Sequence, residues 1–183
     1  MMLLKDATLV QTVNDLGQTI GFAEKFAAHR DGGVFHRAVS VVLVDAKGNI
    51  LLQRRAKGKY HFAGKWANAC CTHPLPLESP LNAANRALGK ELGIQAQVSE
   101  FATMVYQAHD PVSGYTEKEY DHIFVGKLEG QVFPEATEVD AVTWESTQKL
   151  ADRMQKSPSD FVPWLGPVLD AIDGLTGLGR LPR

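Results

Sequence analysis

The sequence has 183 residues, of which 44% are hydrophobic and 22% are charged, and its formal net charge is -2. This length accommodates one domain with a substantial core, and the composition is ordinary for a globular chain. There is no basic excess to favour nucleic-acid binding, and no apolar run approaches the roughly 20 residues that span a bilayer. Residues 1–10 do not resemble a signal peptide, because Lys5 and Asp6 interrupt the apolar start. We therefore expect a single domain over residues 1–183, located in the reducing cytoplasm.

The N-terminal third is expected to hold two hairpins and a short helix. Residues 7–21 predict the first hairpin, because turn-forming residues separate two apolar runs. Residues 22–33 predict a short helix that ends at two glycines. Residues 37–56 predict two strands joined by the turn 45–49.

A capped helix is expected in the middle of the chain, over residues 80–94. Ser79 is positioned as its N-cap, Pro80 suits its first turn, and Gly93 suits its end. Runs rich in β-branched and aromatic residues predict three further strands, 97–108, 119–130 and 141–146.

Two helices are expected after the last strand, the second over residues 160–173, and the glycine-rich tail 174–183 is expected to fray. Strands dominate the middle of the chain, and helices lie between and after them. This order favours an α/β fold, a sandwich with a mixed sheet that an N-terminal hairpin precedes.

The two cysteines of the chain, Cys70 and Cys71, are adjacent, and His73 follows two residues later. Adjacent cysteine side chains rarely satisfy disulfide geometry. Three interpretations remain for the pair: buried small residues, half of a metal site, or a reactive centre.

Histidines and carboxylates offer a candidate metal site. Glu117 and Glu119 are two residues apart at the start of a predicted strand, so both side chains point to one face, whereas His122 points to the other. Together with His29, His36 and His73 they would form a mixed nitrogen and oxygen site that suits Zn, Mn or Fe. The alternative is a set of solvated polar residues on loops.

The stretch "THPLPLESPLNAANRALGKELGI", residues 72–94, resembles the Nudix box, G-x5-E-x7-R-E-U-x-E-E-x-G-U, where U is aliphatic. The retained positions are Glu78, Arg86, Leu88, Glu91, Gly93 and Ile94. Thr72 replaces the first glycine, and Ala87 and Lys90 replace two glutamates that share a helix face with Glu91. A Nudix hydrolase uses those carboxylates to hold the metal ions that activate water. The resemblance therefore implies binding of a Mg-diphosphate rather than its cleavage.

Five blocks resemble the type I isopentenyl-diphosphate isomerases, which are Nudix relatives, and they occur in that family's order. They span residues 21–29, 35–56, 64–75, 117–122 and 161–165. The resemblance implies a Nudix-type α/β/α sandwich. It also implies an isomerase of isoprenoid biosynthesis that interconverts isopentenyl and dimethylallyl diphosphate by a 1,3-allylic proton shift through a tertiary carbocation.

Matching positions imply the catalytic residues. Cys71 corresponds to the catalytic cysteine, Glu119 to the opposing carboxylate, and Tyr106 to the phenol that assists it. Trp164 corresponds to the aromatic residue whose π-face stabilises the carbocation. Cys70 is then expected to be a packed small hydrophobic residue.

The resemblance also implies the ions and the diphosphate contacts. The implied ligands of one divalent metal (Mn, Zn or Mg) are His29, His36, His73, Glu117 and Glu119. A second ion, Mg, would join the substrate diphosphate to Glu91 and the Cys71 carbonyl oxygen. The basic residues expected at the diphosphate are Lys25, Arg55 and Lys59. Some relatives keep an arginine at position 87, and whether Arg86 replaces it stays open here; His61 receives no role.

Two other functions remain as alternatives at this level. The first is a Nudix hydrolase of a nucleoside diphosphate derivative, against which Ala87 and Lys90 argue. The second is a non-catalytic module that binds a metal or a nucleotide, which would leave Cys71, Glu119 and Trp164 unexplained. The sequence implies a small isoprenoid diphosphate as substrate and leaves the oligomeric state open, with a monomer compatible.

Overall fold

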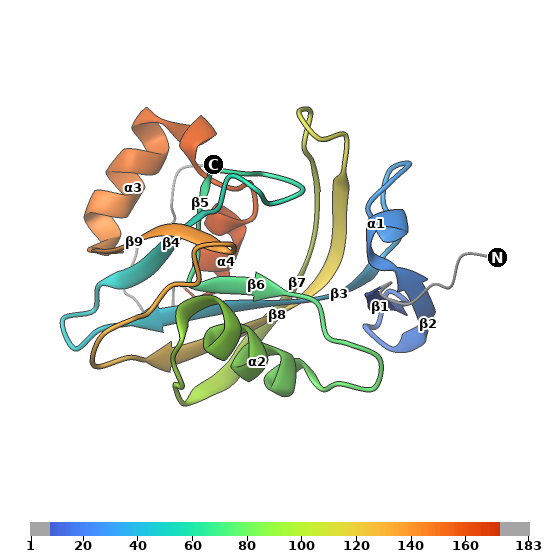
Figure 1. Ribbon diagram of the computed structural model, residues 1–183, viewed down its shortest axis with the longest axis horizontal. Coiled ribbons are helices and arrows are strands. Elements are labelled where there is room, and N and C mark those ends of the chain that lie inside the picture. The colour runs from blue at the N-terminus through green and yellow to red at the C-terminus, as the bar shows by residue number, and fades with distance from the viewer. Residues whose placement is uncertain (1–7, 173–183) are drawn as a thin grey trace.

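An N-terminal hairpin leads into the main sheet of the computed structural model, which describes residues 8–172 (Figure 1). The first elements are β1 (Leu9–Val13), β2 (Thr19–Glu24) and α1 (Lys25–Ala28). The antiparallel pair β1–β2 confirms the expected hairpin. The helix expected over 22–33 is wrong in length, because β2 pairs with β1 as far as Glu24. The Glu24 side chain then caps the first N–H groups of α1.

The main sheet is mixed. The hairpin belongs to this sheet, because β1 pairs antiparallel with β3. The other strands are β3 (His36–Val44), β4 (Ile50–Arg55), β5 (Trp66–Ala67), β6 (Cys70–Thr72), β7 (Val98–His109), β8 (Thr116–Lys127) and β9 (Val139–Glu145). Strand β3 runs parallel to β8 and antiparallel to β6, and β7 runs antiparallel to β8. Strand β4 pairs antiparallel with β5 and β9. All the strands predicted after the hairpin are confirmed, while β5 and β6 were not predicted as separate strands.

Helix α2 (Pro80–Leu92) has the predicted ends. The Ser79 hydroxyl accepts a hydrogen bond of 3.2 Å from the Asn82 N–H. Gly93 ends the helix at φ +63°, the left-handed conformation that glycine adopts without strain.

The C-terminal helices differ from the prediction. They are α3 (Thr147–Lys156), the 3-10 turn η1 (Pro158–Asp160) and α4 (Leu165–Ala171). The helix expected over 160–173 is wrong in its first part, because Phe161 is extended and bridges to Trp66, and the Val162 N–H donates to the Trp66 carbonyl. Trp164 consequently lies at the N-cap of α4. The tail 174–183 lies outside the described residues.

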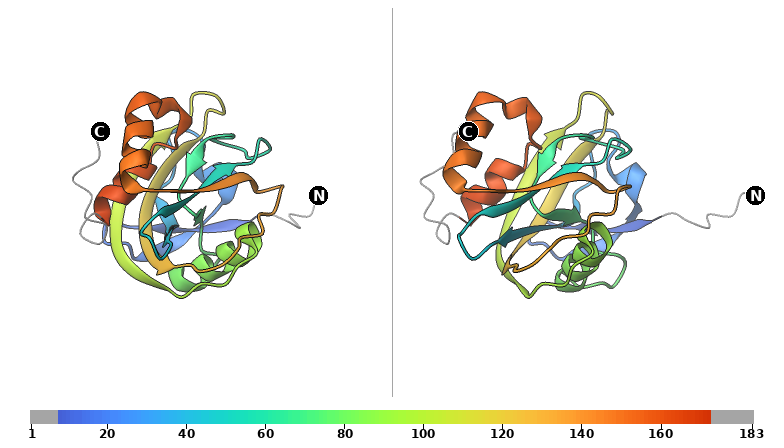
Figure 2. Two further views of the ribbon diagram at one scale, coloured as in Figure 1. Left: turned by 90° about the vertical axis from the view of Figure 1, so that its left-hand side faces the viewer. Right: turned by 60° about the vertical axis from the view of Figure 1, so that its left-hand side comes forward.

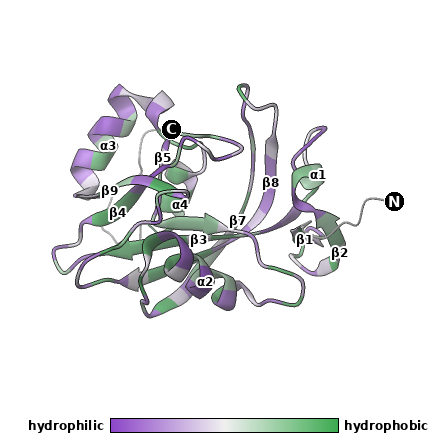
Figure 3. Ribbon diagram, viewed as in Figure 1, coloured by the Kyte–Doolittle hydropathy of each residue, from purple (hydrophilic) through white to green (hydrophobic). Residues whose placement is uncertain are grey.

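Helices cover both faces of the sheet (Figure 2). Successive residues of β3 point to opposite faces, so Val41 belongs to the core cluster that includes Leu88 of α2, and Val42 to the cluster that includes Leu165 of α4. Figure 3 shows the hydrophobic strand β3 between helices that carry polar residues. This arrangement confirms the α/β/α sandwich. Within residues 8–172, none of the helices is long and apolar enough to cross a membrane.

Candidate active site

The sheet register places three candidate residues in one row across three neighbouring strands. His36 of β3 lies opposite Glu119 of β8, and Tyr106 of β7 lies opposite the same glutamate. Paired residues point to one face of a sheet, so the three polar groups meet. The Tyr106 hydroxyl donates a hydrogen bond to Glu119 Oε2, and His36 Nε2 lies 3.4 Å from Glu119 Oε1.

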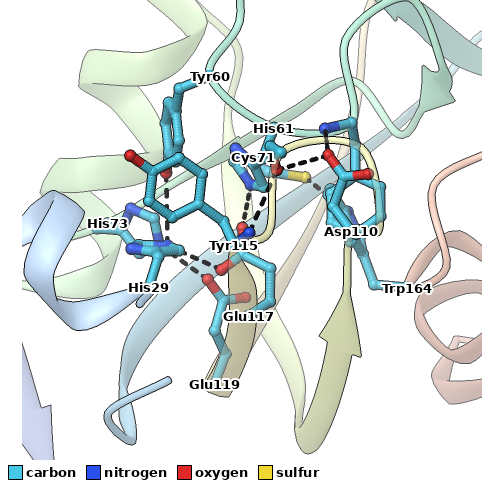
Figure 4. Close-up of polar contacts among 12 residues, drawn as sticks. His29, Tyr60, His61, Cys71, His73, Asp110, Tyr115, Glu117, Glu119 and Trp164 are labelled. Carbon is cyan, nitrogen blue, oxygen red and sulfur yellow. Dashed lines mark hydrogen bonds and ion pairs between the residues drawn. The ribbon is translucent and has the colours of Figure 1, made fainter. Parts of the chain in front are cut away.

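Five side chains gather on this face as a candidate metal site. One possible ligand atom from each lies within 4.8 Å of the others, in the group His29, His36, His73, Glu117 and Glu119. His29 follows α1, His36 begins β3, and His73 follows β6. Figure 4 shows His29 and His73 beside Glu117 and Glu119. The structure thus brings together the five residues that the resemblance implies as ligands.

Hydrogen bonds on the outer side of two imidazoles leave their inner nitrogens available to a cation. His29 Nδ1 lies 2.6 Å from the Lys25 carbonyl oxygen, and His36 Nδ1 lies 2.6 Å from that of Val34. A carbonyl only accepts, so each Nδ1 carries the proton and each Nε2 presents a lone pair. His29 Nε2 lies 2.9 Å from Glu117 Oε2, and two acceptors this close require a proton or a cation between them. His36 Nε2 and Glu117 Oε2 are both buried without a hydrogen-bond partner, so these residues fit a divalent metal ion.

Burial and hydrogen bonding set the ionisation of the cluster. Burial lowers the pKa of His73 to about 4, although a hydrogen bond with Glu119 opposes the shift. Burial alone would raise the pKa of Glu117, but the neighbouring imidazoles of His29 and His61 hold it well below its usual value. Burial opposes charge on His36 as well, but the neighbouring carboxylates of Glu119 and Glu117 raise the His36 pKa. A neutral His73 and an ionised Glu117 are the forms that bind metals.

The two cysteines face opposite sides of β6. Cys70 is fully buried in the apolar core against α2, as a packed small residue. Cys71 lines the cavity on the other face, on the side of the metal cluster. Both thiols are free, which agrees with the exclusion of a vicinal disulfide.

Polar groups surround the Cys71 sulfur. Its Sγ lies 3.2 Å from Asn68 Oδ1 and 3.7 Å from the Ser40 hydroxyl. The indole N–H of Trp164 donates to Cys71 Sγ at 3.2 Å. Burial, and next the nearby Asp121, raise the pKa of the Cys71 thiol to about 12. The sulfur is therefore a protonated thiol near neutral pH, suited to giving a proton.

One cavity of about 370 Å³ connects the metal cluster with the thiol. The candidate residues in its lining are Lys25, Arg55, Lys59, Cys71, His73, Glu91, Tyr106, Glu117 and Glu119. Trp164 is not part of this lining; it is 2% exposed and reaches the Cys71 sulfur from the core. The Arg55 guanidinium carbon lies 5.7 Å from the Trp164 ring centre.

Comparisons with known proteins identify the family. Residues 34–165 match the family model of the NUDIX domain. An isopentenyl-diphosphate Delta-isomerase of Streptomyces avermitilis is 44% identical over 91% of this chain and 84% of its own length. The chain belongs to the isopentenyl-diphosphate Delta-isomerase family. Another member, from Halorhodospira halophila, is 39% identical over 85% of this chain and 89% of its own length.

A solved structure supports the fold of this isomerase-family chain. A protein of Deinococcus radiodurans superposes with a TM-score of 0.70, covering 87% of this chain and 96% of its own. At 14% identity the likeness shows the fold alone. The resemblance stated from the sequence, at the level of both family and fold, is confirmed.

Helix α2 carries the altered Nudix box of this isomerase-family chain, with one carboxylate at the cavity. Glu91 is 5% exposed, accepts a hydrogen bond of 3.1 Å from Gln53 Nε2, and has its pKa raised by burial. Ala87 is buried in the apolar core. Lys90 Nζ lies 2.6 Å from Glu138 Oε1. Positions 87 and 90 therefore add no carboxylate beside Glu91.

Three basic residues, Lys25, Arg55 and Lys59, line the cavity. The Lys59 ammonium forms an ion pair with Glu138. Burial, and next the charge of Lys59, lower the pKa of Lys25. The Arg55 guanidinium donates a hydrogen bond of 3.0 Å to the His61 carbonyl oxygen, while its Nε is buried without a partner. These three residues place positive charge at the cavity, which would favour the binding of an anion.

Arg86 has a local partner on the loop before α2. Its Nε and Nη2 donate to the two carboxylate oxygens of Glu78, each at 2.8 Å, and Nη2 also donates to the His73 carbonyl at 3.0 Å. This bidentate pair ties the segment that carries His73 to α2. Arg86 lines the cavity, but its guanidinium is already bound, so it does not simply replace a free arginine at position 87.

Two residues that contact the candidate site residues were not identified from the sequence. Asn68 contacts the Cys71 sulfur, and His61 contacts Glu117. Both residues lie outside the predicted strands, where no side-chain period indicates a direction. The other unassigned histidines bond elsewhere: His122 Nδ1 lies 2.7 Å from a Glu100 oxygen on the opposite face, as its parity predicts, and His109 is exposed.

Proposed function

We propose that this protein interconverts isopentenyl and dimethylallyl diphosphate by a 1,3-allylic proton shift through a tertiary carbocation. The relatives that share 44% and 39% of its aligned residues carry the name isopentenyl-diphosphate Delta-isomerase. One observation carries the proposal: a single cavity is lined by the Cys71 thiol, by Glu119 with its Tyr106 partner, and by basic residues.

An allylic shift needs a proton donor at one face of the double bond and a base at the other. We assign the Cys71 thiol to one side, and Glu119, held by the Tyr106 hydroxyl, to the other. The protonated state of Cys71 supports its role as donor, since its pKa is about 12. Trp164 lies against the Cys71 sulfur, and we assign its π-face to the carbocation, a contact worth up to about 2 kcal/mol when desolvated.

We assign the remaining polar groups to the metal ions and to the substrate diphosphate. We assign one divalent metal, Mn, Zn or Mg, to the cluster of three histidines and two glutamates; when bound, it supplies positive charge that polarises Glu119. We assign Mg with the substrate diphosphate to Glu91 and to the Cys71 carbonyl. Lys25, Arg55 and Lys59 supply further charge for the diphosphate. A cytoplasmic location belongs to the same proposal.

Hydrolysis of a diphosphate is the less favoured function. Water activation by a Nudix helix uses several carboxylates, whereas Ala87 is buried in the core and Lys90 pairs with Glu138. Glu91 alone offers a carboxylate from this helix to the cavity. A purely binding module would have no use for a thiol aimed at that cavity.

Solvent deuterium separates these functions. Pure protein is incubated with isopentenyl diphosphate and Mg in deuterated water, and the five-carbon products are analysed by NMR and mass spectrometry. We expect deuterium at carbon, dimethylallyl diphosphate as product, and an intact diphosphate. Release of phosphate without deuterium at carbon would indicate a hydrolase and contradict the proposal. Recovery of unchanged substrate would indicate a binding module.

A further inference from the structure

His61 lies next to the metal cluster without belonging to it. It sits on the loop between β4 and β5, is 5% exposed, and is not one of the five grouped ligand residues. Its Nε2 contacts Glu117 Oε1, and its Nδ1 lies 3.3 Å from Arg55 Nη2. One imidazole thus touches both a candidate metal ligand and a candidate diphosphate contact.

The contact with Arg55 determines which nitrogen of His61 carries the proton. A guanidinium can only donate hydrogen bonds, so His61 Nδ1 is the acceptor in that pair. A neutral imidazole then carries its proton on Nε2, which donates it to Glu117 Oε1. Arg55 also donates to the His61 carbonyl at 3.0 Å, which holds the residue from two sides.

The hydrogen bond from His61 leaves one oxygen of Glu117 for a cation. Oε1 is taken by His61, while Oε2 lies 2.9 Å from His29 Nε2 and 3.9 Å from His36 Nε2. Glu117 Oε2 is buried and has no hydrogen-bond partner. The carboxylate is therefore oriented with its free oxygen toward the imidazole nitrogens that present lone pairs.

The surrounding loop holds His61 in this position. The next residue, Phe62, has φ +47°, a conformation unusual for a bulky side chain, and its N–H donates to Asp110 Oδ2 at 2.9 Å. The Tyr60 ring centre lies 4.1 Å from the His61 ring, and the Trp164 ring stacks at 6.3 Å. The strained backbone at Phe62 and the two aromatic rings therefore restrict the position of the His61 side chain.

We propose that His61 is a positioning residue for the metal centre: its Nε2–H orients Glu117 so that Oε2 binds the ion, and Arg55 fixes the tautomer that makes this possible. The inference rests on the metal site of the proposed function. A residue that hydrogen-bonds a metal ligand without binding the metal itself typically raises metal affinity by roughly 10- to 100-fold. In this proposal His61 acts on the metal site through Glu117.

The test measures metal affinity rather than activity. Metal-free protein competes with a chromophoric chelator for Zn²⁺, and the dissociation constant is compared among variants whose folding is checked by circular dichroism. We expect His61→Ala to bind Zn²⁺ roughly 10- to 100-fold more weakly than the unaltered chain. His61→Gln should restore most of the affinity, because its amide can donate to Glu117 and accept from Arg55. His109→Ala, which removes an exposed histidine, is the matched control and should leave the affinity unchanged.

Several outcomes would overturn the inference. Unchanged affinity in His61→Ala would show that Glu117 needs no support. Equal weakening in folded His61→Gln and His61→Ala would show that the hydrogen bond is not what His61 contributes. Failure of the unaltered chain to bind Zn²⁺ would instead refute the metal site of the proposed function, and the inference with it.

Discussion

Replacing each cysteine by serine separates the two thiols, because their surroundings differ. The Cys70 side chain is fully buried in the apolar core against α2, where a hydroxyl would find no partner. The Cys71 sulfur instead lies within hydrogen-bonding reach of Asn68, Trp164 and Ser40. A serine hydroxyl at position 71 can therefore keep polar contacts that the thiol makes.

Cys70→Ser should lower stability and retain activity, whereas Cys71→Ser should retain stability and lower activity. Burying a hydroxyl without a partner costs about 1–3 kcal/mol, so Cys70→Ser should be destabilised by that amount. In a domain of this size the loss lowers the midpoint of thermal unfolding by roughly 2–12 °C. Cys71→Ser should stay within about 1 kcal/mol of the unaltered chain. Its kcat/KM should fall by about 100- to 10,000-fold, because a serine hydroxyl is a far weaker acid.

Thermal unfolding followed by circular dichroism measures the first effect, and conversion of isopentenyl diphosphate measures the second. Cys70→Ser should retain most of the activity at a temperature where it is folded. A folded Cys70→Ser variant without activity, or an active Cys71→Ser variant, would refute the assignment of the two thiols. Equal destabilisation by both changes would refute the argument from hydrogen bonding.

The remaining predictions concern the metal, the diphosphate contacts and the thiol pKa. Elemental analysis of metal-reconstituted protein should give about one tightly held ion per chain, and His36→Gln should lose it; retention would exclude His36 as a ligand. Although burial opposes the shift, hydrogen bonds with Lys59 and Lys90 lower the pKa of Glu138 to about 2, so it is ionised at neutral pH and competes for these lysines. Glu138→Gln should therefore tighten binding of inorganic pyrophosphate in calorimetry, and weaker binding would show that Glu138 orients the lysines instead. Because the Cys71 pKa is raised to about 12, alkylation of Cys71 in metal-free protein should accelerate about tenfold per pH unit up to about pH 10, whereas a plateau below that pH would contradict the raised value.

Local sequence rules were sufficient for strand β8 and helix α2, two of the elements that carry the site. The two-residue period of strands predicted that Glu117 and Glu119 share a face, and that His122 points to the other. The cap residues of α2 predicted both of its ends, since capping depends on neighbours within one turn. These features need no information from distant parts of the chain.

Two helices were predicted wrongly where strand pairing overrides helix propensity. Residues 22–24 belong to β2, because their backbone groups pair with β1. Phe161 is extended and bridges to Trp66, which is far away in the sequence, and the Val162 N–H donates to the Trp66 carbonyl. Neither pairing can be read from the helical pattern of the segment itself.

The sequence by itself determined the family, the order of most elements and the residues proposed as ligands, because these depend on motifs and short periods. Only the tertiary structure decided which further groups support them. His61 lies 56 positions from Glu117, and Lys59 lies 79 positions from Glu138. Such contacts arise when loops at one end of the sheet converge, and their partners are set by strand register rather than by any local pattern.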